Sequence, residues 1–229
     1  MSVGENVAMI RERMASACHK AGRDPANVRL VAVSKYVDTE RMAQAAALGI
    51  RHFGENHAQE VREKQTFFEI HGSFVHFIGQ LQTNKIKYVC GFAGLIESID
   101  RAALAEAVQK RAASLGVVQD VLLQVNIGGE AQKGGCSADE VEALLETTAA
   151  CESLRVRGLM CVPPALPGGE VRPYFARMRS LYEGLRERYG ELPLDTLSMG
   201  MSHDYETAIE EGATEVRIGS ALFGVRDKL

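Results

Sequence analysis

The sequence predicts an α/β fold, a single (β/α)₈ barrel. Strand and helix candidates alternate along the whole chain, which is typical of parallel strands joined by helical crossovers. The first strand candidate, residues 28–34, is apolar on both faces, as expected for a buried parallel strand. Eight such units within 229 residues suit a closed barrel. We place the strands near residues 28–34, 50–54, 74–78, 94–99, 118–127, 155–162, 194–199 and 214–219.

Apolar periodicity and capping residues locate the elements of the first half. Apolar residues recur at helical spacing before Gly22, which ends the first helix. After the first strand, Asp38 can cap a helix that stops at Gly49. The elements expected next are a short strand and turn at 50–54, a helix at 57–68, a strand at 74–78, a short helix at 83–90 and a strand at 94–99.

The second half continues the alternation. An alanine-rich segment with high helix propensity, residues 101–116, precedes a long strand. Ser137 and Glu140 have the spacing of a capping box and are expected to open a helix over 139–150. The last elements are a strand at 155–162, a long amphipathic helix at 171–190, a strand at 194–199, a helix at 202–212 and a strand at 214–219.

The composition indicates an ordinary globular protein. Hydrophobic residues make up 46% and charged residues 24%, which excludes a disordered or collagen-like chain. The formal net charge of -4 argues against a broad nucleic-acid-binding surface but leaves room for one small anion site. An open doubly wound sheet is the alternative fold. No GxGxxG motif follows the first strand, which disfavours a dinucleotide-binding domain.

The five cysteines include no CxxC pair, which favours reduced thiols over a disulfide framework or metal cluster. Charged residues interrupt the apolar residues of the N-terminal segment, so we expect no signal peptide. No apolar run is long enough to span a bilayer. We therefore expect a cytoplasmic protein with a single domain over residues 1–229.

Lys35 is the first candidate functional residue, because function gathers at the carboxyl ends of barrel strands. It follows four consecutive apolar residues, 30–33, which should place it at the barrel mouth. Desolvation lowers the pKa of a lysine, so that the side chain can lose its charge. The neutral amine is then a nucleophile that can form a Schiff base with an aldehyde. The alternative is a solvated loop lysine, which position alone would favour.

Two segments rich in glycine and serine follow the seventh and eighth strands. Ser202 opens a helix after the seventh strand, where its hydroxyl and backbone N–H groups can bind phosphate. The alternative is an ordinary N-cap at Ser202, supported by Asp204, which must point away from any bound phosphate. Gly219 and Ser220 follow the eighth strand. Loops after these two strands commonly form the phosphate site of this fold, so together they predict an anion site.

Three further residues have two interpretations each. Arg217 alternates with Val216 and Ile218 and should point into the mouth, either as a ligand contact or in a structural ion pair. His76 is either a base or a structural histidine whose ring nitrogens are hydrogen-bonded within the fold. Asn56 either bonds a ring hydroxyl or stabilises its own turn.

The chain resembles a known family, the pyridoxal phosphate homeostasis proteins, which are PLP-binding proteins of the alanine racemase N-terminal-domain type. The resemblance covers nearly the whole chain, in family order. Its segments are LVAVSKYV, HFGENHAQE, HFIGQLQTNKIK, VNIGGEAQKGG, GLMCVPP and LSMGMSHDYETAIEEGATEVRIGSALFG. It implies a TIM-type barrel that holds pyridoxal 5′-phosphate (PLP) as a Schiff base on Lys35.

The resemblance also implies a cofactor-binding role for five other residues. Asn56 lies beside the cofactor ring, and Arg217 is the partner of the pyridine nitrogen. The phosphate cradle consists of Ser202, Gly219 and Ser220. No residue is assigned to a metal.

Five residues near the mouth have weaker signals. Lys85 and Lys133 are expected to be solvated, with Lys133 in a glycine-rich loop that can cover the mouth. Relative to the family pattern, Gln80 replaces a basic or imidazole side chain, His57 replaces Arg or Tyr, and Val75 replaces Trp. We expect these three beside the site, where they concern substrate or partner contacts.

The resemblance implies a non-catalytic protein of intracellular PLP homeostasis that stores PLP or delivers it to apo PLP-enzymes. We expect a monomer or weak dimer with no nucleic-acid or membrane partner. A PLP-dependent racemase is the first alternative, but it needs a second acid/base group opposite the lysine, which alanine racemase takes from a second domain not expected here. Arg217 beside the pyridine nitrogen also weakens the ring as an electron sink. A Schiff-base aldolase, without cofactor, is the other alternative.

Overall fold

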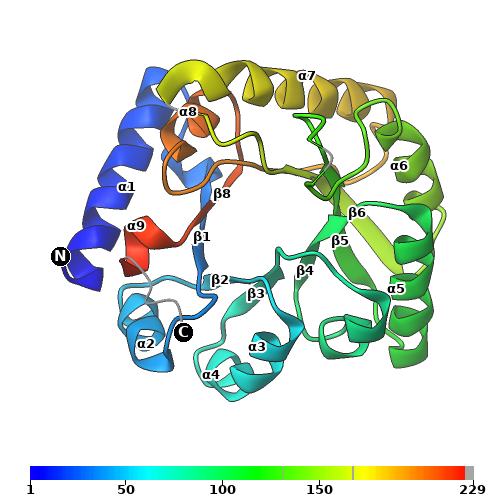
Figure 1. The fold of residues 1–229 in the computed structure, drawn as a ribbon, viewed down its shortest axis with the longest axis horizontal. Helices are drawn as coiled ribbons and strands as arrows, with labels where there is room; N and C mark the ends of the chain where they lie inside the picture. Colours follow the sequence, from blue (N-terminus) through cyan, green and yellow to red (C-terminus); the bar gives the residue numbers. More distant parts are fainter. Residues whose placement is uncertain (131, 167, 225–229) are drawn as a thin grey trace.

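The computed structural model describes residues 1–130, 132–166 and 168–224. Within them, parallel strands pair in chain order and β8 pairs with β1 to close a barrel (Figure 1). The strands are β1 Arg29–Val33, β2 His52–Glu55, β3 Phe74–Phe77, β4 Leu95–Ile99, β5 Gln119–Val125, β6 Leu154–Cys161, β7 Thr196–Ser198 and β8 Glu215–Ile218. The predicted (β/α)₈ barrel is confirmed. The open sheet is excluded, since closure leaves neither β1 nor β8 as an edge strand.

Helices form an outer ring around the strands (Figure 1). The α-helices are α1 Val3–Lys20, α2 Thr39–Ala47, α3 Ala58–Glu63, α4 Gln65–Ile70, α5 Ala102–Leu115, α6 Val141–Ala149, α7 Arg172–Arg188, α8 Tyr205–Glu210 and α9 Ser220–Phe223. Turns of 3₁₀ helix are η1 Pro25–Asn27, η2 Thr83–Tyr88 and η3 Gly168–Val171. Among the helices of the described residues, none combines the length and the apolar character needed to cross a membrane.

Two of the expected helices differ in form. The helix predicted over 57–68 is divided into α3 and α4 at Lys64, whose backbone ends one helix and begins the next. Lys64 is also the buried charged residue of this segment, and its ammonium bonds the carbonyl of Ser34 at 2.7 Å. The segment predicted as a short α-helix at 83–90 forms η2 instead.

The capping predictions have mixed outcomes. Asp38 caps α2 as expected, since its Oδ1 accepts the backbone N–H of Arg41 at 2.8 Å. The capping box predicted at Ser137 is wrong. The backbone N–H and hydroxyl of Ser137 both donate to the carboxylate of Glu140, at 3.0 and 2.8 Å, and α6 begins only after Glu140. A complete capping box is present at the start of α1 instead.

The apolar side chains form two separate clusters. The large one fills the layer between the barrel and its helices. Its fully buried members include Phe53, Phe68, Phe77 and Phe175. The small one lies apart and consists of Leu95, Leu122 and Met160, from β4, β5 and β6. Each such side chain contributes roughly 1.5–3 kcal/mol when fully buried, so the outer layer supplies most of the hydrophobic stabilisation.

A second part of the barrel interior is polar and charged. Buried polar side chains come from β3, β4, β7 and β8, namely His76, Glu97, Ser198, Glu215 and Arg217. Such groups are costly to bury unless each is paired or hydrogen-bonded. Strands from both sides of the barrel therefore contribute polar groups to its interior, and those of β8 lie below the predicted site.

Gly158 offers a test of the packing between neighbouring strands. Its φ is +145°, and an added Cβ would lie 1.8 Å from the carbonyl oxygen of Thr196 on β7. We expect Gly158→Ala to lower the free energy of unfolding by roughly 1–3 kcal/mol, because β6 and β7 must separate to relieve the overlap. Urea unfolding of the purified variant measures this loss.

Gly184 on α7 is the matched control. An alanine Cβ there has no heavy atom within 4 Å. We expect Gly184→Ala to leave the protein as stable or stabilise it by roughly 0.5–1 kcal/mol, since glycine is a poor helix former. Equal stabilities of the two variants would contradict the close approach of β6 and β7.

Candidate functional site

The six predicted site residues lie at or just beyond the carboxyl ends of four consecutive strands of the barrel. Lys35 follows β1, Asn56 follows β2, Ser202 follows β7, and Arg217, Gly219 and Ser220 lie on or directly after β8. In the closed barrel the order of these strands is β7, β8, β1, β2. Residues from both ends of the sequence therefore meet at one part of the carboxyl rim.

The strand register places Lys35 level with Asn56. Val33 of β1 is the partner of Gly54 on β2, and each site residue lies two positions beyond this pair. On the other side of β1, Ala32 is the partner of Ile218, so Gly219 lies level with Val33, two positions below Lys35. Lys35 is half-buried and follows the fully buried Ser34, which agrees with the predicted position at the mouth.

Ser202 joins the loops that follow β7 and β8. Its Oγ accepts the backbone N–H groups of Gly219 and Ala221, both at 3.2 Å. The alternative that Ser202 caps the helix after β7 is wrong, because α8 has Asp204 as its N-cap, and Ser202 instead accepts an N–H of the first turn of α9. Among the described residues, the hydroxyl proton of Ser202 has no acceptor. It is therefore available to an anion, next to the first N–H groups of α9 at Ser220.

The carboxylate of Asp204 is held by its own turn. Its Oδ1 accepts the backbone N–H of Met201 at 2.6 Å and makes no cap bond to α8. Burial raises the pKa of Asp204, although the Met201 N–H and Arg217 act in the opposite direction.

Asn56 has a buried amide oxygen without a hydrogen-bond partner among the described residues. A turn-stabilising asparagine would use this oxygen on nearby backbone N–H groups. The backbone of Asn56 lies close to the next strand, since a Cβ on Gly79 would be 2.0 Å from its carbonyl oxygen. The unpaired oxygen favours the ligand-facing interpretation of Asn56.

Arg217 points into the barrel and is 4% exposed. Its two terminal nitrogens donate to Ser198 Oγ at 2.6 Å and to the carbonyl oxygen of Cys161 at 2.8 Å. Glu97 lies 3.8 Å away, so the ion pair weighed from the sequence is present too. A guanidinium has five N–H groups, so two hydrogen bonds leave donors for a ligand.

Beneath Arg217, His76 belongs to a buried ionic cluster. One ring nitrogen of His76 pairs with Glu97 Oε1 at 2.8 Å, and the other lies 3.0 Å from Nδ1 of His52. Glu215 accepts from Arg29 at 2.9 Å and lies 3.5 Å from His76. Every ring nitrogen of His76 is engaged, which supports the structural interpretation over a catalytic base.

The pKa values of the cluster follow from burial and charge. Burial alone lowers the pKa of His76, but Glu215 and Glu97 outweigh it and raise the pKa to about 9. Burial and the charge of His76 lower the pKa of His52 to about 4. His76 is thus charged and donates from both nitrogens, while neutral His52 accepts. Although burial opposes it, His76 holds the pKa of Glu215 below its usual value.

The ligand atoms of His76, Glu97 and Glu215 lie within 4.8 Å of one another, a spacing that would suit a metal ion. However, protonated His76 cannot ligate a metal, and Arg29 and His76 already pair with the carboxylates. We interpret the three side chains as an ion-pair cluster. All five cysteines, each in the described part of the chain, are free thiols, as their spacing predicted.

Lys133 departs from its prediction. Its Nζ donates to the carbonyl oxygen of Pro163 and pairs with Glu130, both at 2.6 Å, so it is not a solvated lysine. Asn126, at the end of β5, bonds the backbone of Glu130 through both atoms of its amide. These contacts fix the loop after β5 against the segment after β6. Lys85 is exposed, as predicted.

The three departures from the family pattern lie in different surroundings. His57 pairs with the hydroxyl of Tyr36, the residue after Lys35, at 2.8 Å. Gln80 and His57 line a common pocket with Asn56, so both lie beside the candidate site as expected. Val75 does not, because it is buried in the apolar layer between barrel and helices.

Lys64, Glu55 and Glu60 were missed by the sequence interpretation. They form a buried cluster directly beside the Lys35 segment. The available signal was helical spacing, since Lys64 lies three residues after Val61 and four before Phe68, on the buried face of the helix. A charged residue on such a face must have a buried partner.

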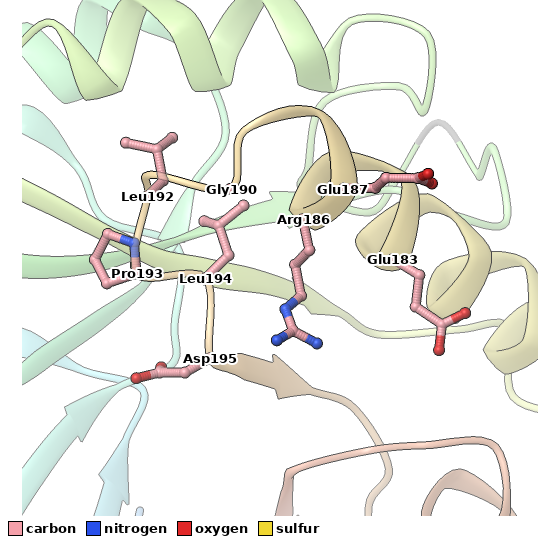
Figure 2. A pocket seen from close by; sticks show the side chains of 8 residues that line it. All are labelled: Glu183, Arg186, Glu187, Gly190, Leu192, Pro193, Leu194 and Asp195. Atoms are coloured by element: carbon pink, nitrogen blue, oxygen red, sulfur yellow. The ribbon is translucent and has the colours of Figure 1, made fainter.

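Figure 2 shows a pocket at a different place, between the end of α7 and the segment leading into β7. Its labelled residues include Arg186, Leu192 and Asp195, all of which precede β7 in the chain. The pocket therefore lies at the amino end of this strand, away from the rim that carries Lys35 and Ser202.

Comparisons with known proteins agree with the motifs. The chain matches the family described as alanine racemase, N-terminal domain, over residues 6–227. It is 45% identical over 227 residues to the pyridoxal phosphate homeostasis protein of Aquifex aeolicus, covering 99% of each chain.

Solved structures give the same fold. The structure of PipY from Synechococcus elongatus with PLP bound is 35% identical, with a TM-score of 0.81, and the match covers 94% of this chain and 100% of that chain. The alanine racemase of Corynebacterium glutamicum is 18% identical with a TM-score of 0.69, over 96% of this chain and 61% of that chain. At that identity the racemase shows a shared fold.

The buried cluster predicts a loss of stability in mild alkali. The pKa of His76 is raised from 6.5 to about 9 on folding. Its stabilising contribution is complete below pH 6.5 and disappears as the pH rises through 9. We expect the free energy of unfolding to fall between pH 7 and 9, with a slope approaching ~1.4 kcal/mol per pH unit. Urea unfolding at several pH values measures this slope.

His76→Gln should flatten this pH dependence, because glutamine does not titrate. The matched control is His19→Gln, since His19 is exposed on α1 and should leave the slope unchanged. A wild-type stability that stays constant or rises from pH 7 to 9 would contradict a charged His76 in the folded protein.

Proposed function

Since the chain belongs to the family of the alanine racemase N-terminal domain, as its motifs predicted, we propose that it is a PLP-binding protein of intracellular PLP homeostasis. We propose that it holds PLP as a Schiff base on Lys35 and buffers or delivers it without robust catalysis. The observation that carries the proposal is the placement of Lys35 one strand away from the Ser202–Gly219 anion cradle.

The residues at the rim suit the parts of PLP. The hydroxyl of Ser202 and the N–H group of Ser220 offer donors to a phosphate at the start of a helix, and Gly219 lets the backbone approach it. Arg217 has N–H donors left for the pyridine nitrogen, and the unpaired amide of Asn56 is available to the ring. When bound, PLP supplies an aldehyde that condenses with an amine and loses water.

Arg217 supports a carrier rather than an enzyme. Its guanidinium stays protonated and donates, so it does not give the pyridine nitrogen a proton. Ser198 and Cys161 hold the guanidinium in place inside the barrel. A ring whose nitrogen is unprotonated stabilises a carbanion at the substrate poorly. Arg217 therefore agrees with a carrier, although alanine racemase tolerates the same arginine.

Delivery follows from the reversibility of the Schiff base. An incoming amine, such as the active-site lysine of an apo PLP-enzyme, attacks the same carbon and returns Lys35 as a free amine. We propose that one barrel domain over residues 1–229 performs this exchange, as a monomer or weak dimer.

An absorption spectrum tests the proposal. Protein purified without added cofactor, or after addition of PLP, should show a band near ~420 nm that borohydride abolishes, since a Schiff base is conjugated with the PLP ring and reducible. Lys35→Ala should lack the band. Lys85→Ala, an exposed lysine, is the matched control and should keep it.

Two outcomes would overturn the proposal. A wild-type protein that takes up no PLP would favour the Schiff-base aldolase, which would trap its own substrate on Lys35 under borohydride. A PLP-loaded protein that racemises an amino acid at rates typical of enzymes, with a median near ~10 per second, would favour the racemase.

Ser202→Ala tests the anion cradle separately. Loss of a hydrogen bond to a charged phosphate costs about 1.5–3 kcal/mol, which corresponds to about a 10- to 100-fold weaker affinity for PLP. Affinity for pyridoxal, which has no phosphate, should not change. The matched control is Ser180→Ala, whose hydroxyl lies exposed on α7. An equal loss for pyridoxal and PLP would mean that Ser202 does not contact the phosphate.

A further inference from the structure

The two residues that flank Lys35 are held by one buried cluster. Ser34 precedes Lys35 and Tyr36 follows it, and both bond to groups of β2 and α3. The centre of the cluster is the ammonium of Lys64, at the junction of α3 and α4. We propose that Lys64 is a positioning residue that fixes the direction of Lys35 and thereby speeds Schiff-base formation with PLP. This inference rests on the proposed function.

The ammonium of Lys64 uses all three of its protons. It donates to the carbonyl oxygen of Ser34 at 2.7 Å, to Glu55 Oε1 at 2.9 Å and to Glu60 Oε2 at 2.7 Å. Its side chain is 10% exposed, and that of Glu55 is fully buried. Because charge-assisted bonds in such surroundings are short and directional, the peptide group that joins Ser34 to Lys35 is fixed from one side.

The same oxygen of Glu60 that pairs with Lys64 also accepts the backbone N–H of Tyr36 at 2.7 Å. The peptide groups on both sides of Lys35 are therefore bonded to the cluster. Tyr36 has a φ of +58°, the left-handed region that a residue with a Cβ adopts only when its surroundings impose it. The bond to Glu60 is one such constraint, and the contact of the Tyr36 hydroxyl with His57 is another.

Packing alone does not explain a lysine at this position. Its neighbours on the buried helical face, Val61 and Phe68, are apolar, and an apolar residue there would avoid the desolvation of an ammonium. The hydroxyl of Ser34 donates to Glu55 at 2.6 Å, so the backbone carbonyl and the side chain of Ser34 join the same cluster. The polar contacts converge on the backbone that carries Lys35.

Fixing this backbone has a chemical consequence. An amine held near the carbonyl carbon it attacks reacts at a high effective concentration, and a displacement of about 1 Å can cost about 100-fold in rate. The strain at Tyr36 would relax if the cluster were removed, and the stem of Lys35 would turn with it. The phosphate and ring contacts lie on other loops and would persist.

The test compares Glu60→Ala with Glu63→Ala, one turn along the same helix. Glu60→Ala removes the acceptor of the Tyr36 N–H but leaves Lys64 paired with Glu55, whereas Glu63 is exposed and contacts Gln59. Stopped-flow absorbance after mixing with PLP gives the rate of Schiff-base formation. Equilibrium titration with pyridoxamine 5′-phosphate, which has no aldehyde, gives the affinity for ring and phosphate.

We expect Glu60→Ala to slow Schiff-base formation by about 10- to 100-fold relative to Glu63→Ala, with an unchanged affinity for pyridoxamine 5′-phosphate. Lys64→Met should act in the same direction, and Lys64→Arg, which keeps the charge and the donors, should restore most of the rate. If Lys64→Met does not fold, the comparison of Glu60→Ala with Glu63→Ala still tests whether the cluster positions Lys35.

Equal rates in Glu60→Ala and Glu63→Ala would overturn the inference, and so would a parallel loss of rate and pyridoxamine 5′-phosphate affinity, which indicates general loosening. Acetylation of Lys35 in the cofactor-free protein, followed by peptide mass spectrometry, tests the positioning without PLP. The acetylation rate should change in Glu60→Ala and not in Glu63→Ala. If the wild type forms no Schiff base, the proposed function fails, and this labelling rate decides the role of Lys64 independently.

Discussion

Pairing of β1 with β8 is the constraint on which the site depends. Four register pairs, from Arg29 with Glu215 to Ala32 with Ile218, join the first strand to the last. This closure brings the residue after β1, Lys35, beside the glycine and serine that follow β8. Without it, Lys35 and the proposed anion cradle would lie at opposite edges of a sheet. The closed hydrogen-bond ladder also removes the two edge strands that an open sheet would expose.

The buried ionic cluster inside the barrel is costly unless its charges are paired. Glu97 and Glu215 are fully buried, and two buried carboxylates repel each other unless cations are interleaved. His76 lies between them, Arg29 pairs with Glu215 from below, and Arg217 approaches Glu97 from above. Positive and negative side chains therefore alternate from the bottom of the barrel to the rim. The cluster also explains why the guanidinium of Arg217 is held in one direction.

Two lysines near the rim have contrasting surroundings. The ammonium of Lys64 is surrounded by oxygen atoms, and one of its hydrogen bonds is to the backbone just before Lys35. Lys35 lies half-buried at the mouth of the barrel, beyond the end of β1. The division of the helix into α3 and α4 at Lys64 places its ammonium next to the Lys35 segment.

The sequence by itself determined the barrel, its strand positions and the rim residues, because hydrophobic period and strand-end position are local properties. It also identified the family, since long motifs occur in order along the chain. The tertiary structure alone decided that Ser202 bonds the start of α9, that Lys133 is held by Pro163, and that Val75 belongs to the core. It alone revealed the Lys64 cluster. These contacts join residues from different strands and loops, and local sequence patterns cannot specify which side chains meet once the barrel closes.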